Sequence, residues 1–221
     1  MKKTLGFVAL AASALALTAA GTAQAQSATP WYGGVSAGAT KSNVDSGEVN
    51  DFLRSLGYGS PSTSADNKDA AYKFSLGYKF SPVVAVEGYY ADLGKYNTRT
   101  SVATPFPGFV SADYKAKGYG IDLMLSAPMT QEFSVYGRLG VIQAETVANF
   151  AFVGSVSPQN PTQNRFSKNK VGQHFGLGLQ YELGPAVALR TEVETYRKLG
   201  DDSTGGELKV DVVSLGAIFR F

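Results

Sequence analysis

Apolar side chains occupy every second position in eight segments of the chain, and this pattern constrains the fold more than any other feature of the sequence. A period of two places successive side chains on opposite faces of a β-strand, whereas one face of a helix repeats about every 3.6 residues. In one segment the alternating apolar residues are Tyr72, Phe74, Leu76, Tyr78 and Phe80. The other segments are 31–39, 84–90, 119–125, 133–141, 175–183, 187–193 and 213–221. We therefore predict an all-β fold with eight strands.

The connections between these strands alternate between short and long. Three of them, at residues 81–82, 128–131 and 184–185, are tight turns. Four longer stretches are rich in Ser, Asn, Asp, Gly and Pro: 43–69, 100–111, 151–168 and 200–207. Short turns at one end, long loops at the other and an even strand number are typical of bacterial outer-membrane barrels. We expect both chain termini at the end with the short turns.

Two kinds of eight-stranded barrel fit this pattern: a transmembrane barrel and a soluble, lipocalin-like barrel around a ligand cavity. The face opposite the apolar one carries Gly, Ser, Glu, Arg and Gln, which suits a tightly filled polar interior. Aromatic residues also gather at both ends of the apolar face, among them Trp31 and Tyr181 near the short turns and Phe175 near the long loops. Two aromatic belts around an apolar band favour the transmembrane barrel.

The first 25 residues have the organisation of an export signal. Lys2 and Lys3 precede an apolar stretch at 5–20, and Ala23-Gln24-Ala25 supplies the small residues of a cleavage site. We predict a cleaved signal peptide at residues 1–25, a barrel domain at 26–221 and a location in the outer membrane. The remaining 196 residues contain 18 basic and 18 acidic side chains, so the net charge gives no basis for nucleic-acid binding.

Several segments, taken in order, resemble the barrel of the outer membrane protein A family. They are residues 78–82 (YKFSP), 86–90 (VEGYY), 92–94 (DLG), 114–118 (YKAKG), 136–140 (YGRLG), 178–181 (GLQY) and 189–192 (LRTE), together with Pro128. Each motif is short, but their order and spacing cover nearly all of residues 26–221 apart from the long loops. The resemblance implies an eight-stranded antiparallel up-and-down transmembrane β-barrel. Larger members continue into a periplasmic peptidoglycan-binding domain, whereas this sequence ends at Phe221, so we expect a barrel alone.

The resemblance also implies a charged pair inside the barrel. The family places a carboxylate on the third strand opposite an arginine on the seventh, and Glu87 and Arg190 match these positions. Two further charged positions of the family fall on Met124 and Gln180, so the expected charge network is thinner. Either charge alone in a narrow interior is poorly solvated, so we expect Glu87 and Arg190 to pair and to close the lumen to ions. Further polar lumen residues are expected at Arg138, Gln180, Glu192 and His174.

Three other functions are alternatives to a closed barrel with a structural and surface-interaction role. A soluble binder is one, and a narrow, porin-like ion channel is another, although eight strands leave no room for a wide pore. The third is a lipid A-modifying enzyme, which needs a histidine base beside a serine. His174 is the single histidine, and no serine lies close to it on its strand. We therefore predict no catalytic residue, and, because cysteine and metal or nucleotide motifs are absent from the sequence, no cofactor.

Four basic residues share the outward parity of their strands: Lys115, Lys117, Arg197 and Lys209. A lysine or arginine facing lipid at the midplane costs about 2–4 kcal/mol. Ten residues at about 3.3 Å each, tilted by about 40°, climb roughly 25 Å, which is the height of the apolar band. We therefore expect these cations at the outer headgroup level, where they contact outer-membrane lipids and the phosphates of lipopolysaccharide.

The last eight residues, SLGAIFRF, are similar to the C-terminal assembly signal of such barrels. The residues that carry the pattern are Ser214, Gly216, Phe219 and Phe221. A terminal strand with a free edge can pair with the barrel assembly machinery by β-augmentation. The long loops are available to extracellular ligands, but they contain no recognisable binding motif.

Overall fold

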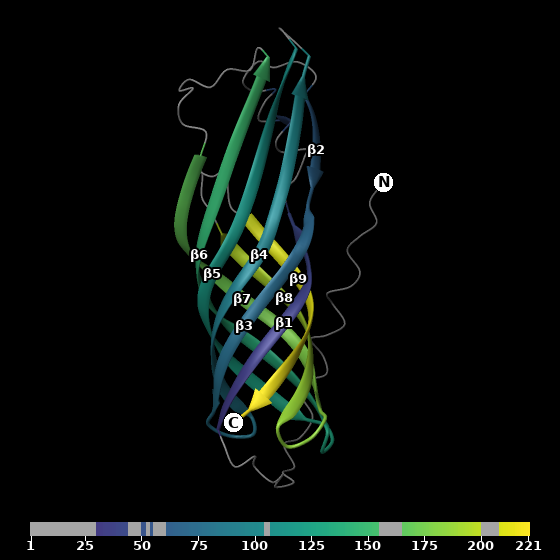
Figure 1. The fold of residues 1–221 in the computed structure, drawn as a ribbon, viewed down its shortest axis with the longest axis vertical. Coiled ribbons are helices and arrows are strands. Elements are labelled where there is room, and N and C mark those ends of the chain that lie inside the picture. The colour runs from purple at the N-terminus through teal and green to yellow at the C-terminus, as the bar shows by residue number, and fades with distance from the viewer. Residues whose placement is uncertain are drawn as a thin grey trace.

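The computed structural model describes residues 30–43, 50–51, 54, 61–103, 107–154, 165–199 and 208–221; the predicted signal peptide lies outside them. The strands are β1 (Trp31–Ser42), β2 (Ser62–Asp66), β3 (Lys68–Lys79), β4 (Val84–Val102), β5 (Gly108–Pro128), β6 (Phe133–Gly154), β7 (Arg165–Glu182), β8 (Val187–Leu199) and β9 (Leu208–Arg220). Each pairs antiparallel with its neighbours, and the pairing of the first strand β1 with the last strand β9 closes the sheet into an elongated barrel (Figure 1). Among the described residues, no helix has the length and apolar character needed to cross a bilayer.

The short strand β2 and the longer β3 form a single barrel strand. They are separated only by Asn67, and both pair with β4, β2 from Ser62 opposite Ser101 and β3 as far as Lys79 opposite Ala85. The barrel thus has eight strands around its circumference. The prediction of an eight-stranded, all-antiparallel barrel is confirmed.

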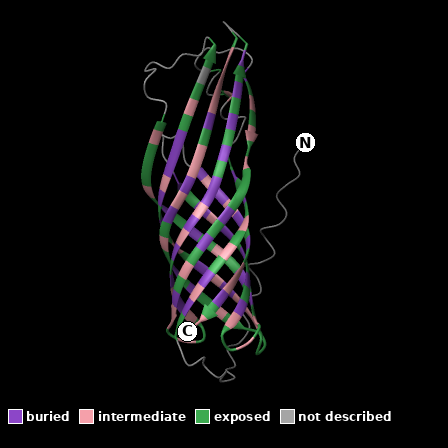
Figure 2. Cartoon of the chain, in the orientation of Figure 1, coloured by how far each residue is buried: buried purple, intermediate pink, exposed green. Residues whose placement is uncertain are grey.

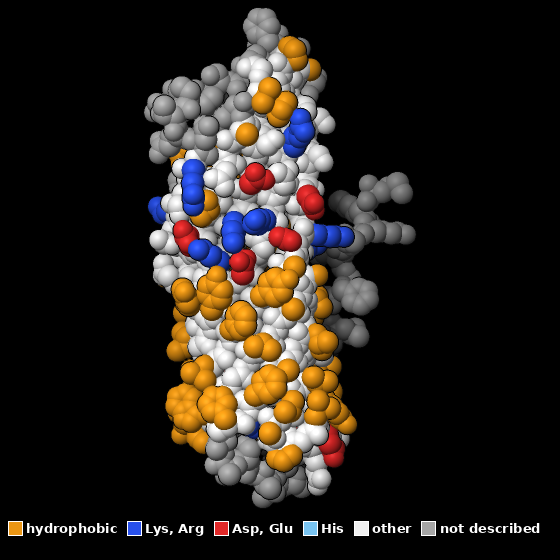
Figure 3. Space-filling view, viewed as in Figure 1, with side chains coloured by type: hydrophobic (Ala, Val, Ile, Leu, Met, Phe, Trp, Pro, Cys, Tyr) orange, Lys and Arg blue, Asp and Glu red, His pale blue; other side chains and the backbone are white. Residues whose placement is uncertain are grey.

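Side chains alternate between the lumen and the outer surface along the strands (Figure 2). Inward residues such as Glu87 are buried, whereas outward apolar residues stay open, with Phe74 57% exposed and Leu215 64% exposed. Figure 3 shows these outward side chains as an apolar band across the lower half of the barrel. A continuous apolar surface of this extent is the signature of a lipid-facing wall rather than a wall in water.

Aromatic side chains lie at both margins of this band. At the margin near the short turns, the ring of Tyr78 makes edge-to-face contacts with Trp31 and Phe80, each with ring centroids 5.0 Å apart. At the other margin, the rings of Tyr90 and Tyr119 lie 5.0 Å apart on neighbouring strands. Aromatic rings in these positions suit the two membrane–water interfaces.

The strands extend into segments that we expected to be loops. β4 and β5 leave only residues 103–107 between them instead of 100–111, and β6 and β7 leave 155–164 instead of 151–168. The loop expected at 43–69 is likewise shortened by β2 and the start of β3. The expectation was wrong because Ser, Asn and Asp also occur in strands that have left the membrane, where polar side chains are solvated on the sheet surface.

Several inward glycines are required by the aromatic rings that lie over them. A Cβ atom added to Gly77 would overlap the ring of Tyr32, and one added to Gly178 would overlap the ring of Tyr136. Small barrels fill their interior by setting large side chains opposite small ones. The glycine-rich inner face is therefore part of the packing of the lumen.

Two β-bulges shift which residues face inward. The register of β4 with β5 shifts between Asp92 and Lys95, where Gly94 has φ +88°, and that of β8 with β9 shifts after Tyr196, where Lys198 has φ 61°. Each bulge inserts one residue and so inverts the alternation beyond it. In β8 this leaves Lys198 exposed and turns Leu199 into the lumen, where it is fully buried.

Candidate functional site

Charged side chains fill much of the half of the lumen nearer the short turns, beside a small buried cluster of Tyr32, Ala85, Met124, Tyr136, Ala188 and Ile218. The charged side chains come from inward positions of β3 to β8, and none is more than 7% exposed. We call these residues the lumen network: Lys73, Glu87, Asp122, Arg138, His174, Arg190, Glu192 and Glu194. Buried charges are tolerated only when they are paired and hydrogen-bonded, so the contacts between them decide whether this half of the barrel is stable.

Arg138 lies at the centre of the network. Its Nη1 donates to Asp122 Oδ2 and its Nη2 to Glu87 Oε2, both at 3.1 Å. The same guanidinium forms an ion pair with Glu192, and its Nη1 lies 3.7 Å from Glu194 Oε1. One side chain of β6 thereby links β4, β5 and β8 across the lumen.

Glu87 and Arg190, the pair expected from the sequence, are in contact. Arg190 Nε also donates to Gln180 Oε1 at 2.7 Å. The guanidinium carbon of Arg190 lies 5.2 Å from the ring centroid of Tyr32 and 5.1 Å from that of Tyr136. Arg190 is therefore held by one carboxylate, one amide and two aromatic faces.

Lys73 and His174 complete the network. Lys73 Nζ donates to Glu192 Oε2 at 2.6 Å and also contacts Glu194. His174 Nδ1 lies 2.9 Å from Asp122 Oδ1, and its Nε2 lies 3.1 Å from Glu194 Oε1. A carboxylate only accepts hydrogen bonds, so a ring protonated on both nitrogens satisfies both contacts.

The contacts close into a ring in which basic side chains and carboxylates alternate: Arg138, Glu192, Lys73, Glu194, His174 and Asp122. With His174 doubly protonated, the network holds four positive and four negative charges. Its carboxylates already have partners within it, and within the described ranges no group of three His, Cys, Asp or Glu side chains is placed to hold a metal ion.

The expectation of a thin network is corrected by these contacts. Met124 and Gln180 do lack charges, but Lys73, Asp122 and Glu194 supply a lysine and two carboxylates from other inward positions. The alternation in the sequence already placed these three residues on the inner face. The alternation does not show which of these inward residues contact each other, because those contacts depend on the relative heights of different strands in the barrel.

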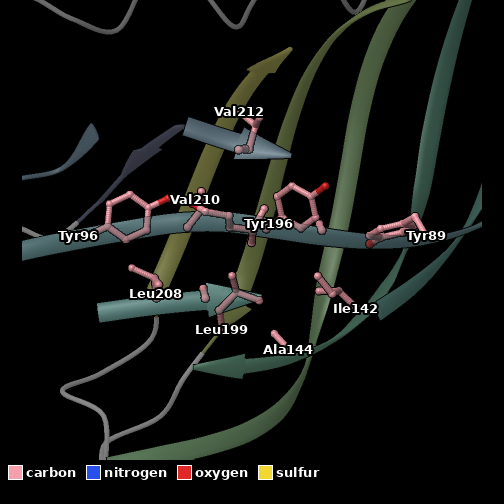
Figure 4. Close-up of a cluster of buried hydrophobic side chains, with 13 residues drawn as sticks. Tyr89, Tyr96, Ile142, Ala144, Tyr196, Leu199, Leu208, Val210 and Val212 are labelled. Atoms are coloured by element: carbon pink, nitrogen blue, oxygen red, sulfur yellow. Dashed lines mark hydrogen bonds between the residues drawn. The ribbon is translucent and has the colours of Figure 1, made fainter. Parts of the chain in front are cut away.

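The half of the lumen nearer the long loops is filled mainly by apolar side chains, with a few buried threonines such as Thr40 and Thr146. We call its buried residues the apolar layer: Ala71, Tyr89, Ala91, Leu93, Tyr96, Ala116, Ile142, Ala144, Tyr196, Leu199, Leu208, Val210 and Val212. In Figure 4 side chains from several strands, among them Tyr196, Leu199 and Val210, point toward one another inside the barrel. Leu199 and Val210 are 0% exposed.

The two layers are packed against each other. The ring of Tyr196 stacks on His174 with centroids 4.1 Å apart and planes 7° apart. A cavity of about 10 Å³ lies between the layers, lined in part by Lys73, Leu93 and Glu194. That volume is about the minimum that one water molecule needs.

The four predicted lipid-facing cations all lie on the outer surface. Lys115 Nζ is 3.3 Å from Asp92 Oδ2, Lys117 Nζ is 3.2 Å from Glu145 Oε2, and Lys209 Nζ is 2.9 Å from Asp211 Oδ2. Arg197 is exposed. Figure 3 shows blue and red side chains gathered immediately beyond the apolar band. We call the outward residues of this zone the charged belt: Lys41, Lys68, Asp92, Lys95, Lys115, Lys117, Glu145, Arg197, Lys209 and Asp211.

Three of the seven cations in the belt were not expected from the sequence. Lys41 lies just beyond the predicted strand 31–39, and Lys68 falls in a segment predicted to be a loop. Lys95 follows the β4 bulge, which inverts the alternation. The first two lie at outward positions once the strands are extended, whereas a bulge leaves no clear signal in the sequence beyond a glycine.

The C-terminal strand β9 is paired on both sides in the folded barrel, with β8 and with β1. Ser214 faces the lumen and is buried, whereas Phe219 and Phe221 face outward, 47% and 65% exposed. Gly216 lies opposite Ser36 of β1, where an added Cβ would meet backbone. This strand is therefore the one whose addition closes the barrel against β1.

The model of the OmpA-like transmembrane domain family matches residues 26–221. Outer membrane protein A of Escherichia coli O157:H7 is 29% identical over 230 residues, an alignment that covers 100% of this chain and 55% of the relative. Outer membrane protein A of Shigella dysenteriae is 30% identical over 149 residues, covering 66% of this chain and 38% of the relative.

Among solved structures, the crystal structure of Neisserial surface protein A has a TM-score of 0.55 at 14% identity, covering 87% of this chain and 98% of that chain. At that identity the likeness shows the fold alone. The chain spans about half the length of the curated relatives that it matches end to end, 55% in the first case. Because the family model covers all but the first 25 residues, the chain belongs to the OmpA-like transmembrane domain family and is an outer-membrane β-barrel.

Proposed function

We propose that this protein is a structural and surface-interaction barrel whose lumen is closed to ions. The observation that carries the proposal is that two different layers fill the lumen in series. The lumen network occupies the half nearer the short turns, and the apolar layer occupies the half nearer the long loops.

The lumen network obstructs an ion by occupying the charges that would solvate it. Arg138 is 3% exposed and Arg190 is 5% exposed, and both are engaged by Glu87. An ion that enters this layer has to displace charge-assisted contacts between buried groups, which are among the strong ones in proteins.

The apolar layer obstructs an ion for the opposite reason. Leu93, Ile142, Leu199 and Val210 offer no polar atom at the lumen surface, and each is no more than 1% exposed. An ion that crosses a dry apolar constriction loses its hydration without replacement, and such constrictions act as gates in channels. We therefore propose that the Glu87–Arg190 pair is part of one of two barriers in series, either of which alone blocks ions.

The same packing bears on the enzyme alternative. Both ring nitrogens of His174 face carboxylates of the network, and the ring is stacked on Tyr196. A general base needs a free nitrogen within reach of the hydroxyl that it deprotonates. We infer that His174 serves the charge balance of the lumen and that the protein has no lipid A-modifying activity.

Planar bilayer recordings of the purified barrel test the closed lumen. We expect no steady channel current from the parent protein, from Glu87→Ala, or from the double variant Tyr196→Ala with Leu199→Ala, because each variant leaves one layer intact. Combining all three substitutions should produce channel events. Leu215→Ala, which shortens an outward side chain on β9, is the matched control and should stay silent.

Steady current through the parent barrel would refute the closed lumen and favour a narrow channel. Current in Glu87→Ala alone would show that the apolar layer is no barrier. A silent triple variant that still folds, judged by a gel shift between unheated and boiled samples, would show that neither layer controls conduction.

A further inference from the structure

The charged belt contains more cations than carboxylates. Seven of the eight barrel strands place a charged outward residue just beyond the apolar band. The cations are Lys41, Lys68, Lys95, Lys115, Lys117, Arg197 and Lys209, and the carboxylates are Asp92, Glu145 and Asp211. The ring therefore has an excess of positive charge at one margin of the membrane-embedded band.

The three carboxylates each hold one lysine, through the Lys115–Asp92, Lys117–Glu145 and Lys209–Asp211 pairs. No described carboxylate forms an ion pair with Lys41, Lys68, Lys95 or Arg197. The surplus charge is thus left without an acidic partner in the part of the chain that the structure describes.

The strand register places two pairs of like charges directly opposite each other. Lys41 of β1 lies opposite Lys68 of β3, and Lys95 of β4 lies opposite Lys115 of β5. Side chains in such positions have Cβ atoms about 4.5–5.5 Å apart, and like charges there are destabilising. An anion bound between the two lysines would turn this repulsion into attraction.

The β3–β1–β9 surface carries the denser of these groups. Lys41 lies opposite Lys68 on one side and opposite Asp211 on the other, and Asp211 pairs with Lys209. We call Lys41, Lys68 and Lys209 the lysine triad. Three ammonium groups from three adjacent strands lie near two carboxylates, Asp211, which pairs with Lys209, and Asp66, whose Oδ1 accepts the Lys68 N–H at 3.4 Å. The group therefore keeps a net positive charge of +1.

The backbone at the triad is fixed. Asn43, at the end of β1, donates its N–H to Lys209 O at 3.1 Å, and its Oδ1 accepts the N–H of Lys209 at 2.8 Å. Ser42 N donates to Asn67 O at 2.9 Å, next to Lys68. The three strands therefore hold the lysine backbones in place before any ligand arrives.

We propose that the lysine triad binds a phosphate group of lipopolysaccharide in the outer leaflet. A phosphate offers several acceptor oxygens that three ammonium groups can share through charge-assisted hydrogen bonds. The triad lies at the margin of the apolar band on the side of the long loops, and an outer-membrane barrel of this family places that side toward the outer leaflet. The proposal extends the lipid contacts expected for Lys209 to two lysines that the sequence did not indicate, and it is independent of whether the lumen conducts.

Binding of purified lipopolysaccharide to the detergent-folded barrel tests the proposal. The test variant carries Lys41→Gln, Lys68→Gln and Lys209→Gln. The control variant carries Arg54→Gln, Arg99→Gln and Arg165→Gln, which removes the same charge from exposed residues outside the belt. The probes are lipopolysaccharide, the same lipopolysaccharide after enzymatic removal of its phosphates, and phosphatidylglycerol.

We expect the triad variant to bind lipopolysaccharide about tenfold more weakly or worse, since it removes three cations that face an anionic membrane surface together. The control should stay within about twofold of the parent, because its three arginines are exposed and lie outside the charged belt. Removing the phosphates should weaken binding to the parent but not further to the triad variant. The difference between parent and triad variant should shrink as salt is raised.

Equal affinity of parent and triad variant, or an equal loss in the control, overturns the proposal. So does parent binding to phosphatidylglycerol that matches its binding to lipopolysaccharide, which would indicate a general preference for anionic lipid. The gel shift on boiling verifies that each variant is folded. Bilayer recordings of the same preparations report on the closed lumen separately.

Discussion

Replacing Lys73 with Met removes the cation that Glu192 and Glu194 share and leaves an unbranched side chain of similar length in the lumen. Lys73 is buried, only 7% exposed, so water does not take over its role. Removing one partner from a buried ion pair costs about 3–5 kcal/mol. Both carboxylates keep other partners, because Glu192 still contacts Arg138 and Glu194 still contacts His174. We therefore expect the lower end of that range, a loss of about 3 kcal/mol in the free energy of unfolding.

Urea-induced unfolding of the barrel in lipid vesicles measures this loss. Trp31 is the only tryptophan of the chain and lies on the outer surface, 47% exposed, so its fluorescence reports directly on whether the wall faces lipid. The companion variant Glu194→Gln separates charge from packing. It should destabilise the parent, but in the Lys73→Met protein it removes a surplus negative charge and should recover about 1 kcal/mol or more.

Two results would refute this reasoning. A loss below about 1 kcal/mol for Lys73→Met, the size expected of an exposed pair, would mean that the lumen charges are solvated after all. An identical effect of Glu194→Gln in both proteins would mean that Lys73 and Glu194 are not coupled, and the closed ring of charges would have no energetic meaning.

Three further predictions concern the closure, the assembly and the internal packing of the barrel. The folded protein should migrate differently on a gel before and after boiling, because a closed sheet has no edge from which to open; identical migration would argue against a closed barrel. Deleting Phe221 should lower the amount of barrel in the outer membrane, whereas Phe221→Tyr should keep it, and unchanged levels after deletion would show that the last residue is not read during assembly. Gly178→Ala should cost about 1–3 kcal/mol because its Cβ would overlap the ring of Tyr136, whereas Gly88→Ala, with nothing within 4 Å of the added atom, should be nearly neutral; equal effects in urea unfolding would disprove the packing argument.

The strand count and the orientation of the wall could be read from the sequence, because both follow from the period of two. Phe74 and Leu215 face lipid and Glu87 and Arg190 face the lumen for this reason alone. The contact of Glu87 with Arg190 was expected from the family resemblance, and the structure shows it. These features follow from the local alternation of side chains and from the Glu87–Arg190 pair that the family resemblance implied.

What the sequence did not reveal depends on relative heights of distant strands. Lys73 meets Glu194 across 121 positions of the chain, and no local pattern encodes that meeting. The inward turn of Leu199 follows from the bulge at Lys198, a lysine with positive φ, which is uncommon outside glycine and asparagine. The apolar layer was missed because nearly all of its members, among them Ile142, Tyr196 and Val210, lie between the predicted strands and the predicted loops.

The rings that lie over glycines also restrict how this barrel can diverge. Tyr136 occupies the space that a side chain at position 178 would need, and Tyr32 does the same at position 77. Neither member of such a couple can be exchanged alone: a larger residue in place of the glycine collides, and a smaller one in place of the tyrosine leaves a void that the glycine cannot fill. Descendants of this sequence should therefore substitute the glycine and the tyrosine of a couple together, with their combined side-chain volume conserved. A descendant with a wider lumen would first have to replace one of these tyrosines by a smaller residue.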